Sequence, residues 1–284
     1  MLISKGLVCP LDQTALVLKN NSLVCENNHC FDLAKQGYCN LLPVQDKRSK
    51  DPGDSREMVN ARASFLGADI YLPVAELIYQ QILPLLNDEN INNIADAGCG
   101  EGYYLNYLAK KLEQDEYHAR LIGFDISKWG IQKAAKKNKN ITWLVASNRH
   151  PPILNNYLDF YLCMFGFPQY SAFANNLKKN GYLIMLDAAE NHLIELRKLI
   201  YDEVNTGKEF NKEDALKNGF ELISEQKLLV SNVRLNNEQL QQLLLMTPHF
   251  FRAPASAKIK LAELAELDIT IDCSCRIFQL KNKL

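Results

Sequence analysis

Two patterns of hydrophobic and polar residues divide the chain near residue 90. From Ile91 onward, short apolar runs alternate with segments in which apolar residues recur at helical spacing. These patterns predict strands at 91–97, 119–125, 141–146, 158–164 and 181–187, and helices ending near 112 and covering 128–137, 170–179 and 190–204. Strands that alternate with helices predict an α/β fold with a doubly wound parallel sheet. Later apolar runs at 220–231 and 269–280 predict an antiparallel edge, with a helix over 236–246.

The first 90 residues have a different pattern. Residues 1–45 form short, polar-interrupted segments with too few apolar residues for a core of their own. A charged, turn-rich stretch follows over 45–55, and Asp54 or Ser55 is expected to cap a helix that runs to about Leu66. A second helix is expected over 72–86. We therefore predict a small module at 1–45, a linker with helices at 46–90, and a larger α/β domain at 91–284.

The composition is that of a folded globular protein. The 284 residues are 47% hydrophobic and 23% charged, with a formal net charge of −1. Disorder and a generally basic nucleic-acid binder are excluded, although a local basic patch is not. No apolar run approaches the ~20 residues that span a bilayer, and no signal peptide is visible. We expect a cytoplasmic protein with reduced cysteines and no membrane partner.

A glycine-rich loop carries the strongest chemical signal. The run Asp96-Ala97-Gly98-Cys99-Gly100-Glu101-Gly102-Tyr103 follows a predicted strand and opens a helix. Glycines let the backbone approach a ligand there. The spacing is G-x-G-x-G, unlike the dinucleotide G-x-G-x-x-G. Asp125 ends the second strand, where a carboxylate can accept hydrogen bonds from ribose hydroxyls. The acidic opening of the loop favours a cationic ligand, so the pattern resembles the S-adenosylmethionine site of class I methyltransferases.

Four of the eight cysteines lie within the first 39 residues. Cys9, Asp12, Cys25 and His29 have the spacing of a small zinc module, except that Asp12 takes the second position, where a cysteine is usual. An aspartate oxygen can also ligate zinc. Zinc binding and a metal-free module stabilised by packing both stay open. Cys30 and Cys39 are interpreted as ordinary buried cysteines.

Longer segments carry a more specific resemblance. They are Cys9–Leu11, His29–Gln45, Lys47–Ser55, the positions Glu57, Met58, Ala61, Arg62, Phe65 and Leu66, then Gly98–Tyr104, His192–Leu196 with Leu199–Tyr201, and Met246–Pro248 with Arg252 and Ala253. On these segments the chain resembles the bacterial 23S ribosomal RNA guanine-N1 methyltransferases over almost its full length. The Asp51–Ser55 run is far more specific than the glycine loop.

The resemblance implies a class I methyltransferase domain with an N-terminal zinc-ribbon-like module. It further implies a homodimer that methylates N1 of a guanine in a 23S rRNA hairpin, with zinc on Cys9, Asp12, Cys25 and His29. Together with the loop chemistry, it assigns S-adenosylmethionine contacts to Tyr71, Asp96, Gly98, Gly100, Glu101, Gly102, Tyr103, Tyr104, Asp125, Ile126, Ser147 and His192.

The acceptor and RNA-binding residues are less well defined. The segment Asp159–Gln169 lies where class I enzymes line the acceptor, and it lacks both the Asn/Asp-Pro-Pro-aromatic signature and the basic residue of the family. Phe165 and Phe167 are candidates for stacking on a base, and Asp159 is a candidate for the catalytic base. Lys47, Arg48, Lys50 and Arg62 form the basic stripe that we expect to contact RNA.

Two other functions stay open. The Asp12 substitution and the altered acceptor segment are also compatible with a methyltransferase acting on another RNA or a small molecule. A weakly catalytic RNA-binding homologue is the third reading, although the intact loop from Asp96 to Tyr104 argues against loss of the cofactor.

Overall fold

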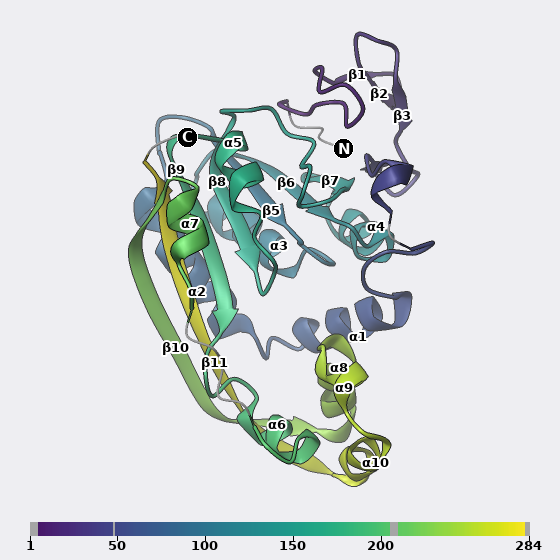
Figure 1. Cartoon of the computed structure of the whole chain (residues 1–284), viewed down its shortest axis with the longest axis vertical. Coiled ribbons are helices and arrows are strands. Elements are labelled where there is room, and N and C mark those ends of the chain that lie inside the picture. The colour runs from purple at the N-terminus through teal and green to yellow at the C-terminus, as the bar shows by residue number, and fades with distance from the viewer. Residues whose placement is uncertain (1–4, 48, 205–209, 282–284) are drawn as a thin grey trace.

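One eight-stranded sheet organises the protein (Figure 1). The computed structural model describes residues 5–47, 49–204 and 210–281. The central parallel strands are β5 (Asn92–Ala97), β6 (Ala119–Asp125), β7 (Thr142–Val145), β8 (Leu158–Met164) and β9 (Leu177–Ala188), in the order β9-β8-β5-β6-β7. Helices α3 (Tyr103–Gln114), α4 (Lys128–Lys137) and α5 (Tyr170–Asn176) alternate with them. The predicted alternation of strands and helices is therefore confirmed.

Two long strands complete the other edge of the sheet. β11 (Glu266–Leu280) pairs antiparallel with β9 and with the edge strand β10 (Phe220–Asn236). The predicted antiparallel edge is confirmed, and both strands extend beyond the predicted bounds. The short helix α7 (Glu213–Lys217) precedes β10, and α8 (Asn237–Met246), α9 (His249–Arg252) and α10 (Ala255–Glu263) connect β10 to β11.

The far ends of β10 and β11 carry a helical lobe, which we define as α6 (Ile194–Ile200) together with α8, α9 and α10 (Figure 1). Within it, α10 packs on α8 and α6. The lobe lies at the opposite end of the molecule from the N-terminal module, and α8 also packs on α1 (Arg56–Gly67), which follows the linker.

Three predicted helices differ in length from the observed ones. α5 ends at Asn176 because β9 begins at Leu177, which pairs with Leu158. The helix expected over 190–204 is only α6. The segment expected over 72–86 is α2 (Leu72–Ile82) followed by a 3-10 turn, η2 (Leu83–Leu85), because Pro84 cannot supply the backbone donor that a longer helix needs. Ser55 caps α1 as predicted, since its Oγ accepts a hydrogen bond from Met58 N at 3.3 Å.

The N-terminal module completes its core against the sheet. Strands β1 (Val17–Lys19), β2 (Ser22–Val24) and β3 (Cys30–Asp32) form a small antiparallel sheet. β4 (Tyr38–Asn40) leaves it and pairs parallel with β7, before the turn η1 (Val44–Asp46). Leu7 and Leu23 share one hydrophobic cluster with Phe124 and Leu144 of the main sheet. The predicted division into 1–45, 46–90 and 91–284 stays a prediction. Strand β4 joins the first of these segments to the third through its pairing with β7.

Among the residues that the structure describes, none of the helices has both the length and the hydrophobicity of a membrane-spanning helix.

A buried tryptophan dominates the packing beneath the glycine loop. Trp143 is fully buried, and its indole occupies the space that a Cβ atom would take at Gly102 (2.5 Å) and at Gly123 (2.2 Å). Glycine is therefore required at both positions for a steric reason.

Replacing Gly102 by alanine should destabilise the fold. Its φ of 78° disfavours any side chain, and the new methyl group would overlap Trp143. We expect Gly102→Ala to lower the free energy of unfolding by roughly 2–5 kcal/mol, measured by urea denaturation. Gly67→Ala is the matched control, because within the described part of the chain no atom outside the backbone of its own helix lies within 4 Å of its Cβ position. Equal stability of the two variants would contradict this packing.

Candidate functional site

The carboxyl ends of β5 and β6 shape the predicted glycine loop. Gly98, Gly100 and Gly102 all have positive φ angles, of 77°, 56° and 78°, which glycine adopts without the steric cost of a side chain. Gly98 N donates to Phe124 O at 2.8 Å and so ties the loop to the end of β6. The loop thus crosses the edge of the sheet at which doubly wound folds bind their ligands.

Asp125 joins this loop to the next one. Its Oδ2 accepts from Gly100 N at 3.0 Å, and its Oδ1 accepts from Ser127 N at 2.7 Å. Each carboxylate oxygen has a second lone pair. Asp125 can therefore hold the loop in place and still accept hydrogen bonds from the hydroxyl groups of a ligand, as the sequence predicted for a ribose.

The loop is rich in buried acid. Asp96 is 1% exposed, and its Oδ1 has no hydrogen-bond partner among the described residues. Burial, reinforced by the charges of Asp125 and Glu101, raises the pKa of Asp96 to about 8. Burial also raises the pKa of Glu101, against the opposing charge of Arg62. An unpaired, buried carboxyl group is costly. The site therefore suits a ligand with an ammonium or sulfonium group, both of which S-adenosylmethionine has.

The linker packs against the turn after β6, and Arg62 of α1 reaches the glycine loop, where its Nη1 lies 3.5 Å from the Cβ position of Gly100. Asp54 forms an ion pair with Arg62, and its carbonyl oxygen accepts from Ser127 Oγ at 2.8 Å. A Cβ atom at Gly53 would lie 2.9 Å from Ile126 Cγ2. Arg62 also donates to Met246 O at 3.2 Å, which connects α1 to the helical lobe. Arg62 thus joins the linker, α1 and the helical lobe beside the glycine loop.

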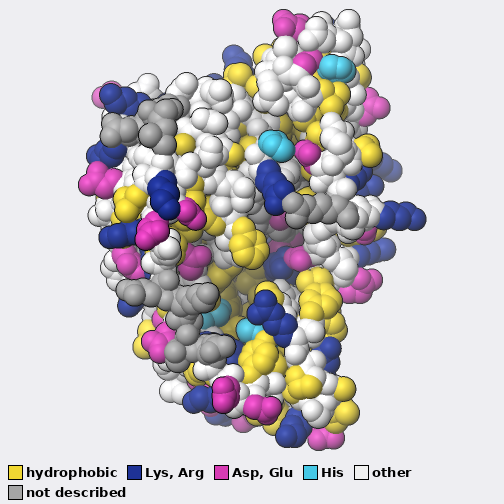
Figure 2. All heavy atoms as spheres, in the orientation of Figure 1, with side chains coloured by type: hydrophobic (Ala, Val, Ile, Leu, Met, Phe, Trp, Pro, Cys, Tyr) yellow, Lys and Arg dark blue, Asp and Glu magenta, His cyan; other side chains and the backbone are white. Residues whose placement is uncertain are grey.

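Four aromatic side chains form a wall beside the loop, which we call the aromatic wall: Tyr71, Tyr104, Phe165 and His192. The Tyr71 ring centroid lies 6.1 Å from that of His192 and 6.3 Å from that of Phe165. The centroids of Tyr104 and Phe165 are 6.4 Å apart. The structure therefore brings Tyr71, Tyr104 and His192 together, as a shared cofactor site requires. Figure 2 shows histidine and hydrophobic side chains in a hollow between the sheet and the helical lobe.

Hydrogen bonds fix the orientation of the His192 ring. Its Nδ1 accepts from Asp272 N at 3.2 Å, so the proton of the neutral ring is on Nε2, which lies 3.2 Å from the Tyr71 hydroxyl. Burial lowers the pKa of His192 to about 4. The ring is therefore neutral near pH 7, and both nitrogens are engaged. Burial raises the pKa of Tyr71, so its hydroxyl keeps its proton.

The other predicted cofactor residues lie around the same edge. Tyr103 begins α3, and its ring contacts Tyr104 at a centroid distance of 5.1 Å. Ile126 follows β6 beside the linker, and Ser147 follows β7, where its Oγ accepts from Arg149 N at 3.2 Å. Each therefore follows the end of a parallel strand or opens the helix after the loop.

Asp159 lies apart from this group. It is the second residue of β8, at the amino end, whereas the loop lies at the carboxyl ends. Its carboxylate accepts from Asn93 N at 2.9 Å and pairs with Lys178 Nζ at 2.7 Å. The geometry assigns these oxygens to joining β5, β8 and β9, and does not bring them to the candidate site.

The predicted basic stripe divides into two parts. Lys47 and Lys50 are exposed on the linker, and Arg48 lies outside the described residues. Arg62 is not on this open surface: it is half-buried at the glycine loop, with Asp54, Glu101 and Asp125 raising the pKa of its guanidinium against the effect of burial. The sequence pattern around Arg62 did not indicate that its side chain would lie among Asp54, Glu101 and Asp125.

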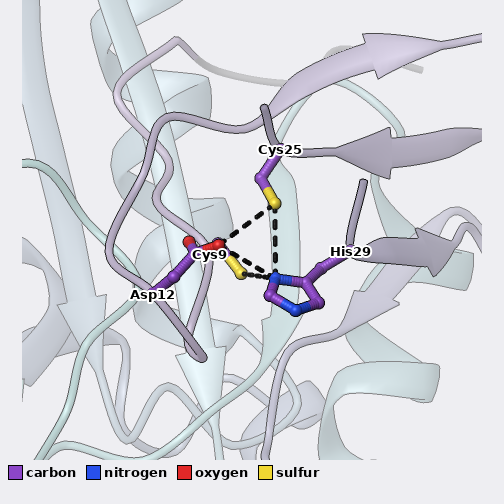
Figure 3. A group of neighbouring side chains, drawn as sticks. All are labelled: Cys9, Asp12, Cys25 and His29. Carbon is purple, nitrogen blue, oxygen red and sulfur yellow. Dashed lines mark hydrogen bonds and ion pairs between the residues drawn. The ribbon is translucent and has the colours of Figure 1, made fainter. Parts of the chain in front are cut away.

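Four side chains of the N-terminal module converge on one point (Figure 3). The potential ligand atoms of Cys9, Asp12, Cys25 and His29 all lie within 4.8 Å of one another. Cys9 and Asp12 lie on the turn before β1, Cys25 directly follows β2, and His29 directly precedes β3. Two short turns thus present two ligands each, as in a zinc ribbon.

The distances in this cluster fit a tetrahedral zinc ion. His29 Nδ1 lies 3.5 Å from Cys9 Sγ and 3.4 Å from Cys25 Sγ. Zinc–sulfur and zinc–nitrogen bonds of about 2.3 and 2.0 Å at tetrahedral angles separate the two ligand atoms by about 3.5 Å. Asp12 Oδ2 lies 3.5 Å from Cys25 Sγ and 2.9 Å from His29 Nδ1. Asp12 therefore occupies the fourth ligand position.

Hydrogen bonds prepare Asp12 for this position. Bonds from Asn27 and Thr14 lower the pKa of its carboxyl group well below the ordinary value, so it stays ionised. The remaining cysteines are outside the cluster. Cys39 is buried, as interpreted from the sequence, and burial raises its pKa to about 12, whereas Cys30 is exposed, so that interpretation was wrong for Cys30.

Family models match the N-terminal module and the sheet domain separately, and known proteins match almost the whole chain. The family model described as RlmA, N-terminal, a zinc ribbon, matches residues 7–50, and one described as Methyltransferase domain matches residues 94–181. YxjB of Bacillus subtilis (strain 168), provisionally named a 23S rRNA (guanine-N(1)-)-methyltransferase, is 31% identical over 268 residues, 93% of either chain. The 23S rRNA (guanine(748)-N(1))-methyltransferase of Streptomyces fradiae is 28% identical over 265 residues, 92% of either chain.

Solved structures share the fold. The YcgJ protein of Bacillus subtilis superposes with a TM-score of 0.51 at 12% identity, covering 73% of this chain and 99% of its own. A chain from the complex of the Haloferax volcanii Trm112 methyltransferase activator with a candidate methyltransferase gives a TM-score of 0.52 at 14% identity, covering 81% and 99%. The class I methyltransferase fold with an N-terminal zinc ribbon, predicted from the sequence, is confirmed.

The cluster of Cys9, Asp12, Cys25 and His29 should bind one zinc ion per chain. We expect Asp12→Ala to weaken zinc binding about tenfold or more, because one ligand is lost, and Asp12→Cys to retain it. Competition with a chromophoric chelator measures both affinities. Cys30→Ser is the control, since this exposed thiol is not in the cluster. Unchanged affinity in Asp12→Ala would remove Asp12 from the ligand set.

Asp96 should make the stability of the ligand-free protein depend on pH. The folded-state pKa of Asp96 is raised to about 8. The protonated carboxyl group therefore stabilises the fold fully below about pH 4, the ordinary pKa of an aspartate. This stabilisation is lost as the pH rises toward the folded-state pKa. Asp96→Asn keeps the shape and cannot ionise. We expect urea unfolding to show wild type losing stability relative to this variant between about pH 5 and 8. A constant difference over this range would show that Asp96 titrates normally.

Proposed function

Because the chain belongs to the family of 23S rRNA (guanine-N1)-methyltransferases, we propose that it transfers the methyl group of S-adenosylmethionine to N1 of a guanine in a 23S rRNA hairpin. The observation that carries the proposal is the acidic glycine loop at the carboxyl ends of β5 and β6, with the unpartnered Asp96 Oδ1 in it. This loop supplies what a cationic cofactor needs within a chain whose relatives are named for this reaction.

The cofactor, when bound, supplies an electrophilic methyl group on its sulfonium. The protein's own part is binding, orientation and exclusion of water. Asp125 would accept hydrogen bonds from the ribose, and the unpaired Asp96 oxygen and the loop backbone would face the amino acid part. The aromatic wall, in which Tyr71 is 2% exposed, keeps water away from this side of the loop.

The target N1 carries a proton that must leave during the reaction. His192 is an unsuitable base, because its Nδ1 lone pair accepts from Asp272 N, its Nε2 carries the ring proton, and burial lowers its pKa to about 4. In-line transfer then depends chiefly on alignment of the guanine with the methyl group.

The linker and the zinc module support RNA binding. Lys47 and Lys50 are exposed, and Arg149 is exposed in the loop after β7. Figure 2 shows Lys and Arg side chains projecting from the side of the molecule that carries the linker and α1. We propose that these cations contact phosphates, and that zinc on Cys9, Asp12, Cys25 and His29 keeps the module folded beside them. The homodimer and the cytoplasmic location stay predictions.

Labelled S-adenosylmethionine, unmodified 23S rRNA and the purified protein should together give label in 1-methylguanosine after digestion to nucleosides. Label in another nucleoside would keep the enzyme class and change the target base. Absence of label with the cofactor still bound would contradict the proposed acceptor.

The variant Asp125→Ala should raise the dissociation constant for the cofactor, measured by calorimetry. It loses the proposed contact with the ribose and leaves Gly100 N without its carboxylate partner.

The same assay tests the linker. Replacing both Lys47 and Lys50 by glutamate should raise the KM for RNA and reduce the salt dependence of binding by about one unit of slope per lost phosphate contact. The charge-matched control replaces two exposed lysines of β9 and β10, Lys179 and Lys227, by glutamate. An unchanged salt dependence would place the RNA elsewhere.

A further inference from the structure

Phe165 has an unusual backbone for an aromatic residue. Its φ is 52°, in the left-handed region, although it is neither glycine nor asparagine. Such a conformation is costly for a bulky residue and persists only where the surroundings impose it. Phe165 N donates to Leu186 O at 2.7 Å and so fixes this backbone at the end of β8. The orientation of this ring therefore costs conformational free energy in the Phe165 backbone.

The ring is held on one side and open on the other. It packs against Tyr71, Tyr104 and His192, with a centroid distance of 5.7 Å to His192. Phe165 nevertheless stays 39% exposed. An aromatic core residue would be buried, whereas Phe165 combines partial exposure with a backbone that is costly for a bulky side chain. The combination is typical of a ring that is positioned to receive a ligand.

The open ring borders the glycine loop. A Cβ atom at Gly166 would lie 3.7 Å from Ala97 O, at the end of β5 where the loop begins. Asn148 Nδ2 donates to Phe167 O at 3.4 Å and lies 3.7 Å from the Cβ position of Gly98. The segment that carries Phe165 is thus adjacent to the loop in which the proposed function places the methyl donor.

We propose that Phe165 is a positioning residue on whose exposed face the acceptor guanine stacks during methyl transfer. The inference rests on the proposed function and adds the residue that holds the target base. Stacking tolerates any aromatic ring and requires a π-face, and one stacked base contributes a factor of about 5 to 150 in affinity. The ring thereby replaces part of the base stacking that the guanine loses when it leaves the RNA.

The test compares Phe165→Leu, which keeps an apolar side chain without a π-face, with Phe165→Tyr, which keeps the ring. Steady-state methylation of 23S rRNA should show kcat/KM for RNA reduced about 5- to 150-fold in Phe165→Leu and largely restored in Phe165→Tyr. The rates are measured at saturating S-adenosylmethionine, so that a change in cofactor affinity at the aromatic wall does not enter kcat/KM for RNA, and calorimetry measures that affinity separately. Phe251→Leu makes the same change at an exposed ring of α9, with no loss expected.

Each outcome decides the matter. Wild-type kcat/KM in Phe165→Leu, or an equal loss in Phe165→Tyr, would overturn stacking. A loss of cofactor affinity as large as the loss of kcat/KM would assign the ring to the cofactor instead. If wild type itself forms no 1-methylguanosine, the proposed function fails and this inference fails with it, whereas a wild type that is active beside a fully active Phe165→Leu overturns the inference alone.

Discussion

The hydrogen bond from Gly100 N to Asp125 Oδ2 joins the ends of two neighbouring strands, and the candidate site depends on it. The bond is possible only because the loop takes left-handed backbone angles at three glycines. Trp143 fills the space that Gly102 and Gly123 leave beneath the loop. The Asp125 carboxylate at the site and the Trp143 indole beneath the loop both depend on this one tight turn. The residues of the loop are therefore tightly restricted.

Arg62 has a comparable role between distant segments. It pairs with Asp54 of the linker, faces Glu101 of the loop and donates to Met246 at the end of α8. A half-buried guanidinium with acids around it satisfies several partners at once through its planar set of donors. The linker, the loop and the helical lobe are thereby held in one arrangement, and the hollow between them keeps its shape.

The N-terminal module shows how a small unit can be stabilised without a large core. Its few apolar side chains join a cluster of the main sheet, and β4 extends that sheet beside β7. The ligand cluster of Cys9, Asp12, Cys25 and His29 fixes the turns that lie farther out. Asp12 fits there because neighbouring hydrogen bonds from Asn27 and Thr14 keep it charged and direct Oδ2 toward His29.

The sequence by itself determined the parallel sheet, the glycine loop, Asp125 and the four-residue cluster, because each depends on local periodicity, turn chemistry or short spacing. It also determined the family through the run from Asp51 to Ser55. Only the tertiary structure decided that Arg62 lies at the loop, that Asp159 lies at the opposite end of the sheet, and that Phe165 has a strained backbone. Those features depend on contacts between residues far apart in the chain, and on burial, which no local pattern of side chains specifies.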